Sequence, residues 1–252
     1  MSKVIWNHEG KEYALPEMLI NGNGKIGKGV WHFSTLPGLD DYFSEKWDIT
    51  VKGTCPCNCK GCYGMRGNYR FKSTKDALAI RTFVAMEDLD FLKAEIIREI
   101  RKHNIKAVRV HATGDFFSKE YVQMWIDIAI ECIETVFWTY TKAEGKGFDS
   151  ELNTFNSLPN CNIVPSVIKD FGFNFGHIDY LLRVFKSLKA EGKDPYICPC
   201  GTDKNQHCNN CKGCSANKYV LFIEHSTEYK AEKDDLFPTI AEIIRNQKSM
   251  TI

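Results

Sequence analysis

Cysteine is the residue type of this chain with the clearest chemical potential, because nine of its eleven cysteines fall into two short groups. The first group lies in "CPCNCKGC", residues 55–62, and the second in "CPCGTDKNQHCNNCKGC", residues 198–214. A disulfide framework distributes cysteines to join distant segments, whereas neighbouring thiolates converge on one metal centre. The two groups therefore predict metal binding. Cys132 and Cys161 stand alone and are interpreted as small buried apolar residues.

The first group places Cys55, Cys59 and Cys62 in C-x3-C-x2-C spacing, with Cys57 as an additional thiol whose role stays open. Three thiolates on one loop bind three irons of a 4Fe–4S cluster and leave the fourth iron without a protein ligand. An open coordination position distinguishes a reactive metal centre from a closed structural one. The alternative is a zinc loop that uses all four cysteines, although structural zinc sites normally draw two pairs of ligands from separated segments.

The second group follows C-x2-C-x2-C spacing with a Cys-Pro dipeptide upstream, which is typical of bacterial ferredoxin clusters. Four cysteines around one zinc ion are the alternative, and His207 widens the choice of ligands. Cys200 is the alternative to Cys198 as the upstream ligand. We therefore expect a second 4Fe–4S cluster or zinc, held by Cys198, Cys208, Cys211 and Cys214.

Apolar runs of strand and helix type alternate after residue 46, and they must position these cysteines. Pro165 restricts its strand to a sheet edge or a strand end, and Ser118 is expected to cap a helix whose buried stripe extends to Ile133. The alternation in "KAVRVHATGD" predicts that Arg109 and His111 share one face of a strand. We expect strands over 47–52, 106–115, 135–142, 162–167 and 218–225, and helices over 76–103 (with a break in "MEDLD"), 118–133, around 181–188 and over 237–247.

Strands separated by helices favour βαβ units and a parallel sheet, so the expected fold is α/β, a partial (β/α) barrel. In such sheets ligands bind where strands end and loops begin. The first cysteine group and the Thr113-Gly114-Asp115 turn both follow expected strands, which indicates an active site. We divide the chain into a lead-in segment packed on the core (1–46), the (β/α) core (47–195) and a cysteine-rich metal-binding segment with a final strand and helix (196–252).

The C-x3-C-x2-C loop after an early strand resembles the radical S-adenosylmethionine superfamily. The resemblance implies that the open iron binds S-adenosylmethionine, which is cleaved to start radical chemistry on a substrate that the sequence does not identify. It also implies an electron donor such as flavodoxin or ferredoxin. Two departures are Gly61, where the family usually has an aromatic residue, and the extra Cys57. The cofactor-binding residues that the resemblance implies are Tyr63, Thr113, Gly114, Asp115 and Ser166.

A second resemblance rests on "KIGKGVWHFSTLPG", "CYGMRGNYRF", "RVHATGDFFSKEYVQMW" and "FWTYTK". Together these stretches resemble a phage-borne family named after gene product eighty-eight, over roughly residues 24–225. This similarity implies a phage or mobile-element origin and says little about the substrate.

The charge of the chain is balanced, with a formal net charge of +1, so the overall charge does not indicate binding to a nucleic acid or a membrane. Locally, residues 49–75 contain six basic residues and no acidic one, interleaved with aromatics. This pattern is compatible with a nucleotide or nucleic acid as substrate. The alternative interpretation is a solvated basic loop, whose positive charges the thiolates and a cofactor carboxylate need in any case. Two alternative functions are a non-catalytic zinc or iron–sulfur module that contacts nucleic acid, and a redox carrier. No signal peptide or membrane span is evident, which predicts a cytoplasmic protein.

Overall fold

The computed structural model describes residues 4–22, 26–56, 62–168, 172–199, 207–208, 211, 213–223 and 237–248. Its main sheet has five strands in the order β3-β4-β7-β8-β9. The last four are parallel, and β3 joins β4 antiparallel. The expected α/β class with a parallel sheet is therefore confirmed, whereas closure into a partial barrel stays a prediction. The strands are β3 (Ile20–Asn21), β4 (Trp31–His32), β7 (Ala107–Val110), β8 (Val136–Thr141) and β9 (Cys161–Pro165).

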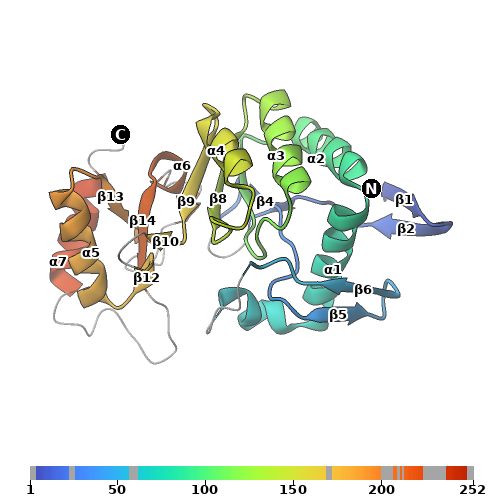
Figure 1. Cartoon of the computed structure of the whole chain (residues 1–252), viewed down its shortest axis with the longest axis horizontal. Coiled ribbons are helices and arrows are strands. Elements are labelled where there is room, and N and C mark those ends of the chain that lie inside the picture. Colours follow the sequence, from blue (N-terminus) through green and yellow to red (C-terminus); the bar gives the residue numbers. More distant parts are fainter. Residues whose placement is uncertain are drawn as a thin grey trace.

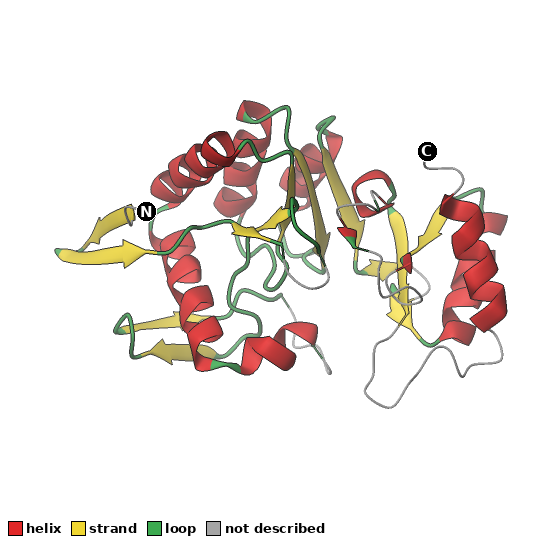
Figure 2. Cartoon of the chain, turned by 180° about the vertical axis from the view of Figure 1, so that it is seen from behind, coloured by secondary structure: helices red, strands yellow, loops and turns green. Residues whose placement is uncertain are grey.

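Helices cover one face of this sheet, as Figures 1 and 2 show from opposite sides. Val108, Val110 and Phe137 point from the sheet into an apolar core that α3 completes with Tyr121 and Trp125. Burial of such side chains is the main stabilising contribution, at about 25 cal/mol per Å² of apolar area removed from water. The helices are α1 (Lys72–Glu87), α2 (Leu89–His103), α3 (Lys119–Glu131) and α4 (Asp149–Ser157).

Two helix boundaries expected from the sequence are confirmed. The long helical stretch breaks at Asp88, whose carboxylate accepts a hydrogen bond from Phe91 N–H at 3.0 Å and so caps α2. The hydroxyl of Ser118 caps α3 by accepting from Tyr121 N–H at 3.1 Å. The buried stripe was drawn too far, however. Because α3 ends at Glu131, Ile133 is 55% exposed instead of facing the core.

The lead-in segment packs on the core and also supplies strands. Its hairpin of β1 (Val4–His8) and β2 (Lys11–Leu15) buries Trp6 near the junction of α1 and α2, where the indole donates to Asp88 at 3.0 Å. Further along, β4 enters the main sheet beside β7. A two-residue strand leaves no periodic pattern, so it is not predictable from the sequence.

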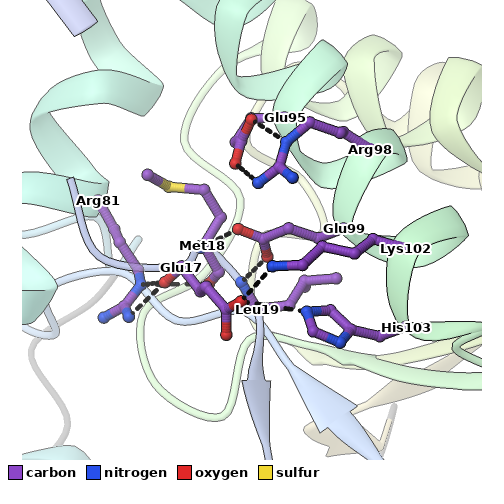
Figure 3. Close-up of polar contacts among 9 residues, drawn as sticks. All are labelled: Glu17, Met18, Leu19, Arg81, Glu95, Arg98, Glu99, Lys102 and His103. Atoms are coloured by element: carbon purple, nitrogen blue, oxygen red, sulfur yellow. Dashed lines mark hydrogen bonds and ion pairs between the residues drawn. The ribbon is translucent and has the colours of Figure 1, made fainter. Parts of the chain in front are cut away.

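A buried carboxylate anchors the lead-in segment to α2 (Figure 3). Glu99, which is fully buried, accepts hydrogen bonds from the N–H groups of Met18 at 2.8 Å and Leu19 at 2.7 Å. Arg81, also buried, donates to the carbonyls of Glu17 and Met18. Burial raises the pKa of Glu99 to about 7, and the two N–H bonds oppose this rise.

The strand expected over 47–52 exists as β6 (Ile49–Lys52), but its pairing differs from the expectation. It forms an antiparallel hairpin with β5 (Asp41–Ser44) outside the main sheet. A short alternating strand carries no information about its partner, and here the adjacent hairpin partner is nearest in the chain. The first strand of the parallel part of the sheet is β4 instead. In the sequence, the β5–β6 hairpin follows β4 and precedes the first cysteine group.

The C-terminal part has its own sheet, in the order β12-β14-β13, with all three strands parallel. A separate apolar cluster begins at Ile168 and includes residues of α5 and α7. The helix α5, which we had placed in the core segment, therefore packs with the C-terminal strands. The elements are β10 (Val167–Ile168), β11 (Gly172–Phe173), β12 (Phe175–Gly176), α5 (Ile178–Ala190), β13 (Pro195–Ile197), α6 (Gly213–Ala216), β14 (Tyr219–Ile223) and α7 (Phe237–Lys248). In the described part of the chain, no helix combines the length and apolarity that crossing a bilayer requires.

Candidate functional site

The first cysteine group begins at the carboxyl edge of the main sheet. Backbone hydrogen bonds join Thr54 N to Leu36 O at 3.0 Å and Cys55 N to Gly38 O at 3.1 Å, which aligns the loop with the segment that follows β4. Gly38 N–H in turn donates to Cys55 Sγ at 3.2 Å. Burial raises the pKa of the Cys55 thiol to about 11, and this N–H bond opposes the rise. The thiol of Cys55 is thus half-buried and hydrogen-bonded at the place where parallel sheets bind ligands.

The far end of the cysteine loop returns to the same edge. Cys62 is half-buried and close enough to Cys55 to affect its pKa. Two residues later, Gly64 packs so closely that a Cβ there would lie 3.0 Å from Thr113 Cγ2. Tyr63 begins the 3-10 helix η1 (Tyr63–Met65). Cys57 and Cys59 lie outside the described residues.

Three threonines hold the strand ends together around the Thr113-Gly114-Asp115 turn. The hydroxyls of Thr35 and Thr54 share a hydrogen bond of 2.7 Å, and Thr113 Oγ1 donates to Thr35 O at 3.0 Å. Gly114 has φ +78°, and a Cβ at this position would overlap Thr35 Oγ1. The position therefore requires glycine for its backbone conformation and for the close approach.

Asp115 is buried and already engaged in hydrogen bonds. Its Oδ1 accepts from Thr141 Oγ1 at 2.7 Å and from Phe116 N–H at 2.8 Å, and its Oδ2 accepts from Lys142 N–H at 2.8 Å. Burial raises the pKa of Asp115 to about 6, and these three bonds oppose the rise. The carboxyl group therefore ties the end of β7 to the end of β8. It keeps one lone pair on Oδ2 for a further donor.

Ser166 lies at the same edge, directly after β9, and is buried. Its N–H donates to Thr141 O at 2.9 Å, so Thr141 connects Ser166 with Asp115. The structure thus brings Cys55 and Cys62 together with Thr113, Gly114 and Asp115, with Ser166 one strand further along. Thr35, Thr54 and Lys142 complete this region. The threonines were missed because isolated threonines in loops carry no motif.

The expectation that Arg109 and His111 share one face is wrong. His111 has φ +63°, a left-handed conformation that interrupts the alternation after β7. Its ring turns to the helical side, where Nε2 hydrogen-bonds Tyr121 Oη at 2.9 Å. Burial lowers the pKa of His111 to about 3. Arg109 faces the opposite side, with its guanidinium 4.7 Å from the centre of the Tyr140 ring.

The second cysteine group gathers against that opposite side of the sheet. Cys198, Cys208, Cys211 and Cys214 all belong to one apolar cluster that also contains Trp138 and Val164 of the main sheet. The hydroxyl of Tyr196 is 3.2 Å from Cys211 Sγ, and that of Tyr140 hydrogen-bonds the Cys214 thiol. Burial raises the pKa of Cys214 to about 12. Cys200 lies outside the described residues.

No three or more Cys, His, Asp or Glu side chains are arranged to hold a metal ion within the part of the chain that the structure describes. Metal binding by the cysteine-rich segment (196–252) therefore stays a prediction. Of the two solitary cysteines, Cys132 is buried as expected, whereas Cys161 is half-buried.

The fold and the site define a mixed α/β protein with a cysteine-bearing loop at the carboxyl edge of a parallel sheet and a second cysteine group on one face of that sheet. The chain belongs to the Gene product 88 family, whose family model matches residues 18–235. The resemblance to this phage-borne family is thereby confirmed, and the comparisons do not extend to the radical S-adenosylmethionine superfamily.

Two curated relatives have the same description. The chain is 27% identical over 150 residues to the Gene 88 protein of Mycobacterium phage L5, covering 53% of this chain and 62% of that protein. It is 25% identical over 143 residues to the Gene 88 protein of Mycobacterium phage D29, covering 54% of this chain and 58% of that protein. The chain thus spans less than two thirds of the length of these relatives. No solved structure matches it significantly.

Proposed function

We propose that this protein is a radical S-adenosylmethionine enzyme with a 4Fe–4S cluster on Cys55, Cys59 and Cys62. The observation that carries the proposal is the position of Cys55 and Cys62 at the carboxyl edge of four parallel strands, against the Thr113-Gly114-Asp115 turn. In a partial (β/α) barrel, this edge is where cofactor and substrate bind. The loop and the turn are far apart in the sequence, so their contact supports a shared site.

The surroundings of Cys55 fit a cluster ligand. A backbone N–H donated to sulfur, as Gly38 does at 3.2 Å, stabilises a metal-bound thiolate and adjusts the potential of its cluster. Burial disfavours a free thiolate at this position, whereas a coordinating thiol is deprotonated by the metal itself. Lys142, whose charge lowers the pKa of Cys55, adds a positive neighbour.

The strand-end residues would position the cofactor. When bound, the cluster and S-adenosylmethionine would supply a 5′-deoxyadenosyl radical that abstracts a hydrogen atom from the substrate. Gly114 lets the backbone approach the ligand closely. The remaining lone pair on Asp115 Oδ2 would accept from the cofactor's ammonium group, while Lys142 would attract its carboxylate. Tyr63 and Ser166 are the further cofactor-binding candidates, and a flavodoxin- or ferredoxin-type protein would supply the electron.

A nucleic acid or nucleotide is the substrate class that the surface next to this site favours. Phe71 is 61% exposed and Met65 is 50% exposed, and both lie among the exposed side chains of Arg66 and Arg70. Guanidinium groups follow phosphates, and exposed aromatic rings stack on bases. Lys72 contributes less, since it is paired with Glu45 and Asp76.

Anaerobic reconstitution with iron and sulfide tests the proposal. We expect dithionite-reduced protein to cleave S-adenosylmethionine to 5′-deoxyadenosine. Cys59→Ser should remove the first cluster and this activity, whereas the matched variant Cys57→Ser should retain both. Equal loss in the two variants, or a colourless zinc protein that binds nucleic acid without cleaving S-adenosylmethionine, would replace the proposal with the non-catalytic alternative.

A further inference from the structure

The second cysteine group is distinct from the proposed active site and carries an inference of its own. We propose that Cys198, Cys208, Cys211 and Cys214 ligate a second 4Fe–4S cluster, and that Arg109 of the main sheet is the cation that balances its negative charge. This inference does not depend on the proposed function, because none of these residues belongs to the first site.

The four thiols occupy a well-defined place between the main sheet and the C-terminal strands. Cys198 follows β13 directly and is 7% exposed, with its N–H donated to Leu221 O at 2.8 Å. Cys214 lies in α6 and is 8% exposed. The side chain of Asn162 in β9 donates to Cys214 O at 2.8 Å and to Asn217 O at 3.0 Å, which holds α6 against the main sheet.

Two tyrosines direct their hydroxyls at these sulfurs from different elements. Tyr196 of β13 lies 3.2 Å from Cys211 Sγ, and Tyr140 of β8 hydrogen-bonds the Cys214 thiol. A Cβ on Gly213 would overlap the ring of Tyr196, so the backbone can pass this close to the ring only because residue 213 is glycine. Hydroxyl donors to sulfur are a recognised means of adjusting an iron–sulfur cluster.

Arg109 presents a cation on the same side of the sheet as the second cysteine group. Its half-buried guanidinium packs over Tyr140, and its buried Nε has no hydrogen-bond partner among the described residues. The neighbouring ring in register on β4 is His32, whose pKa is lowered to about 4 by burial and by Arg109, so this ring is neutral at pH 7. An anion close to this side chain would therefore interact favourably with it.

A cluster bound by four thiolates would supply such an anion, because it is negatively charged in both of its common oxidation states. Arg109 packs on the ring of Tyr140, and the hydroxyl of that tyrosine hydrogen-bonds Cys214. Arg109 therefore acts on the cluster through space, and Tyr140 lies between them as the ring on which the guanidinium packs.

The chemistry of the ligand set favours a cluster over zinc. A zinc ion needs its four ligands around one point, whereas a cubane binds each thiolate through a different iron and holds the sulfurs further apart. The described thiols share one apolar cluster, and their spacing in the sequence distinguishes the two kinds of site. The spacing C-x2-C-x2-C with a separate Cys-Pro is also that of ferredoxin clusters.

The first test isolates the second group in the full chain by changing Cys55, Cys59 and Cys62 to Ser. After anaerobic reconstitution we expect about four irons and about four sulfides per chain, as one cubane requires. Adding Cys211→Ser or Cys214→Ser should remove most of this iron, whereas Cys132→Ser should not. Zinc in place of iron, or full iron with Cys214→Ser, would overturn the ligand assignment. If the triple variant does not fold, the difference in iron between the native chain and Cys214→Ser gives the same answer.

The second test addresses Arg109. Arg109→Gln should retain the cluster but shift its one-electron midpoint potential to more negative values, because a nearby cation stabilises the more negative reduced state. Arg109→Lys should restore most of the native potential. An unchanged potential in Arg109→Gln, with the cluster present by its absorbance and iron content, would show that Arg109 does not balance its charge.

Discussion

The two cysteine groups of this protein lie in contrasting surroundings. Around Cys55 the neighbours are backbone N–H groups, threonine hydroxyls and the buried carboxyl of Asp115. Around Cys214 they are apolar side chains, two tyrosines and one arginine. The first group lies at an edge where strands end and ligands enter, and the second lies on a sheet face covered by other elements. The contrast is consistent with the proposals of a reactive centre at the edge and an enclosed centre on the face.

The difference also concerns how each site is held. The first depends on close backbone approaches and short polar contacts, so small changes in geometry should be costly there. The second depends on burial, with α6 fastened to β9 by Asn162. A substitution that adds or removes a few atoms should therefore cost more unfolding free energy at the first site than at the second.

Gly114→Ala should give the largest effect. The substitution forces a left-handed conformation on alanine and overlaps Thr35 Oγ1, which together should cost about 2–5 kcal/mol of unfolding free energy. Gly10→Ala is the matched control, since Gly10 has the same φ of +78° but nothing within 4 Å of the added Cβ. Urea denaturation measures both. Equal losses in the two variants would show that the strand ends are not tightly packed.

Glu99→Gln tests the anchor between the lead-in segment and α2. The amide group places a donor against one of the N–H groups of Met18 and Leu19, so we expect a loss of about 1–3 kcal/mol. The native protein should also become less stable as pH rises from about 4.5 to about 7, because the folded state keeps a proton on Glu99 that the unfolded chain loses. Denaturant midpoints across this range measure the trend. If the stability of Glu99→Gln fell with pH as steeply as that of the native protein, the pH dependence would come from other titratable groups.

Tyr196→Phe should have a smaller effect at the second site. It removes the hydroxyl that lies 3.2 Å from Cys211 Sγ while keeping the ring, at a cost of about 0.5–1.5 kcal/mol. Calorimetry of the reconstituted protein measures the loss. A penalty as large as that of Gly114→Ala would contradict the view that burial, rather than polar geometry, holds the second site.

Changing Arg66 and Arg70 together to Gln should leave stability unchanged and weaken binding to single-stranded nucleic acid. With two phosphate contacts removed, the slope of log affinity against log salt concentration should decrease by about 1.4. Fluorescence anisotropy at several salt concentrations measures this slope. The control is Lys186→Gln, which changes an exposed lysine on α5. An equal decrease of the slope in this variant would show that Arg66 and Arg70 do not form a specific binding surface.

Much of the fold was predictable where a local pattern reports it. The break at Asp88, the cap at Ser118 and the edge position of the strand with Pro165 each follow from short-range chemistry and were confirmed. The pairing of β6 and the orientation of His111 were not predictable, because one depends on partners in space and the other on a single left-handed residue.

The candidate sites show the same limit. Spacing identified the cysteines. The strand before the first group pairs outside the main sheet, however, and the loop reaches the sheet edge through the backbone bonds of Thr54 and Cys55 to the segment after β4. Spacing does not show which residues from other elements surround a thiol. Arg109 and Tyr196 are separated from each other by a large part of the chain, and only the fold brings them to the second group.

The most direct test of the central claim, an open iron on the first loop, uses electron paramagnetic resonance on Cys214→Ser, in which the second cluster should be absent. We predict that the dithionite-reduced variant gives a 4Fe–4S signal that shifts when S-adenosylmethionine is added, because the cofactor binds the iron that no side chain ligates. A reduced cluster whose signal does not change on this addition would mean that all four irons are already ligated. That result would contradict the proposed reaction.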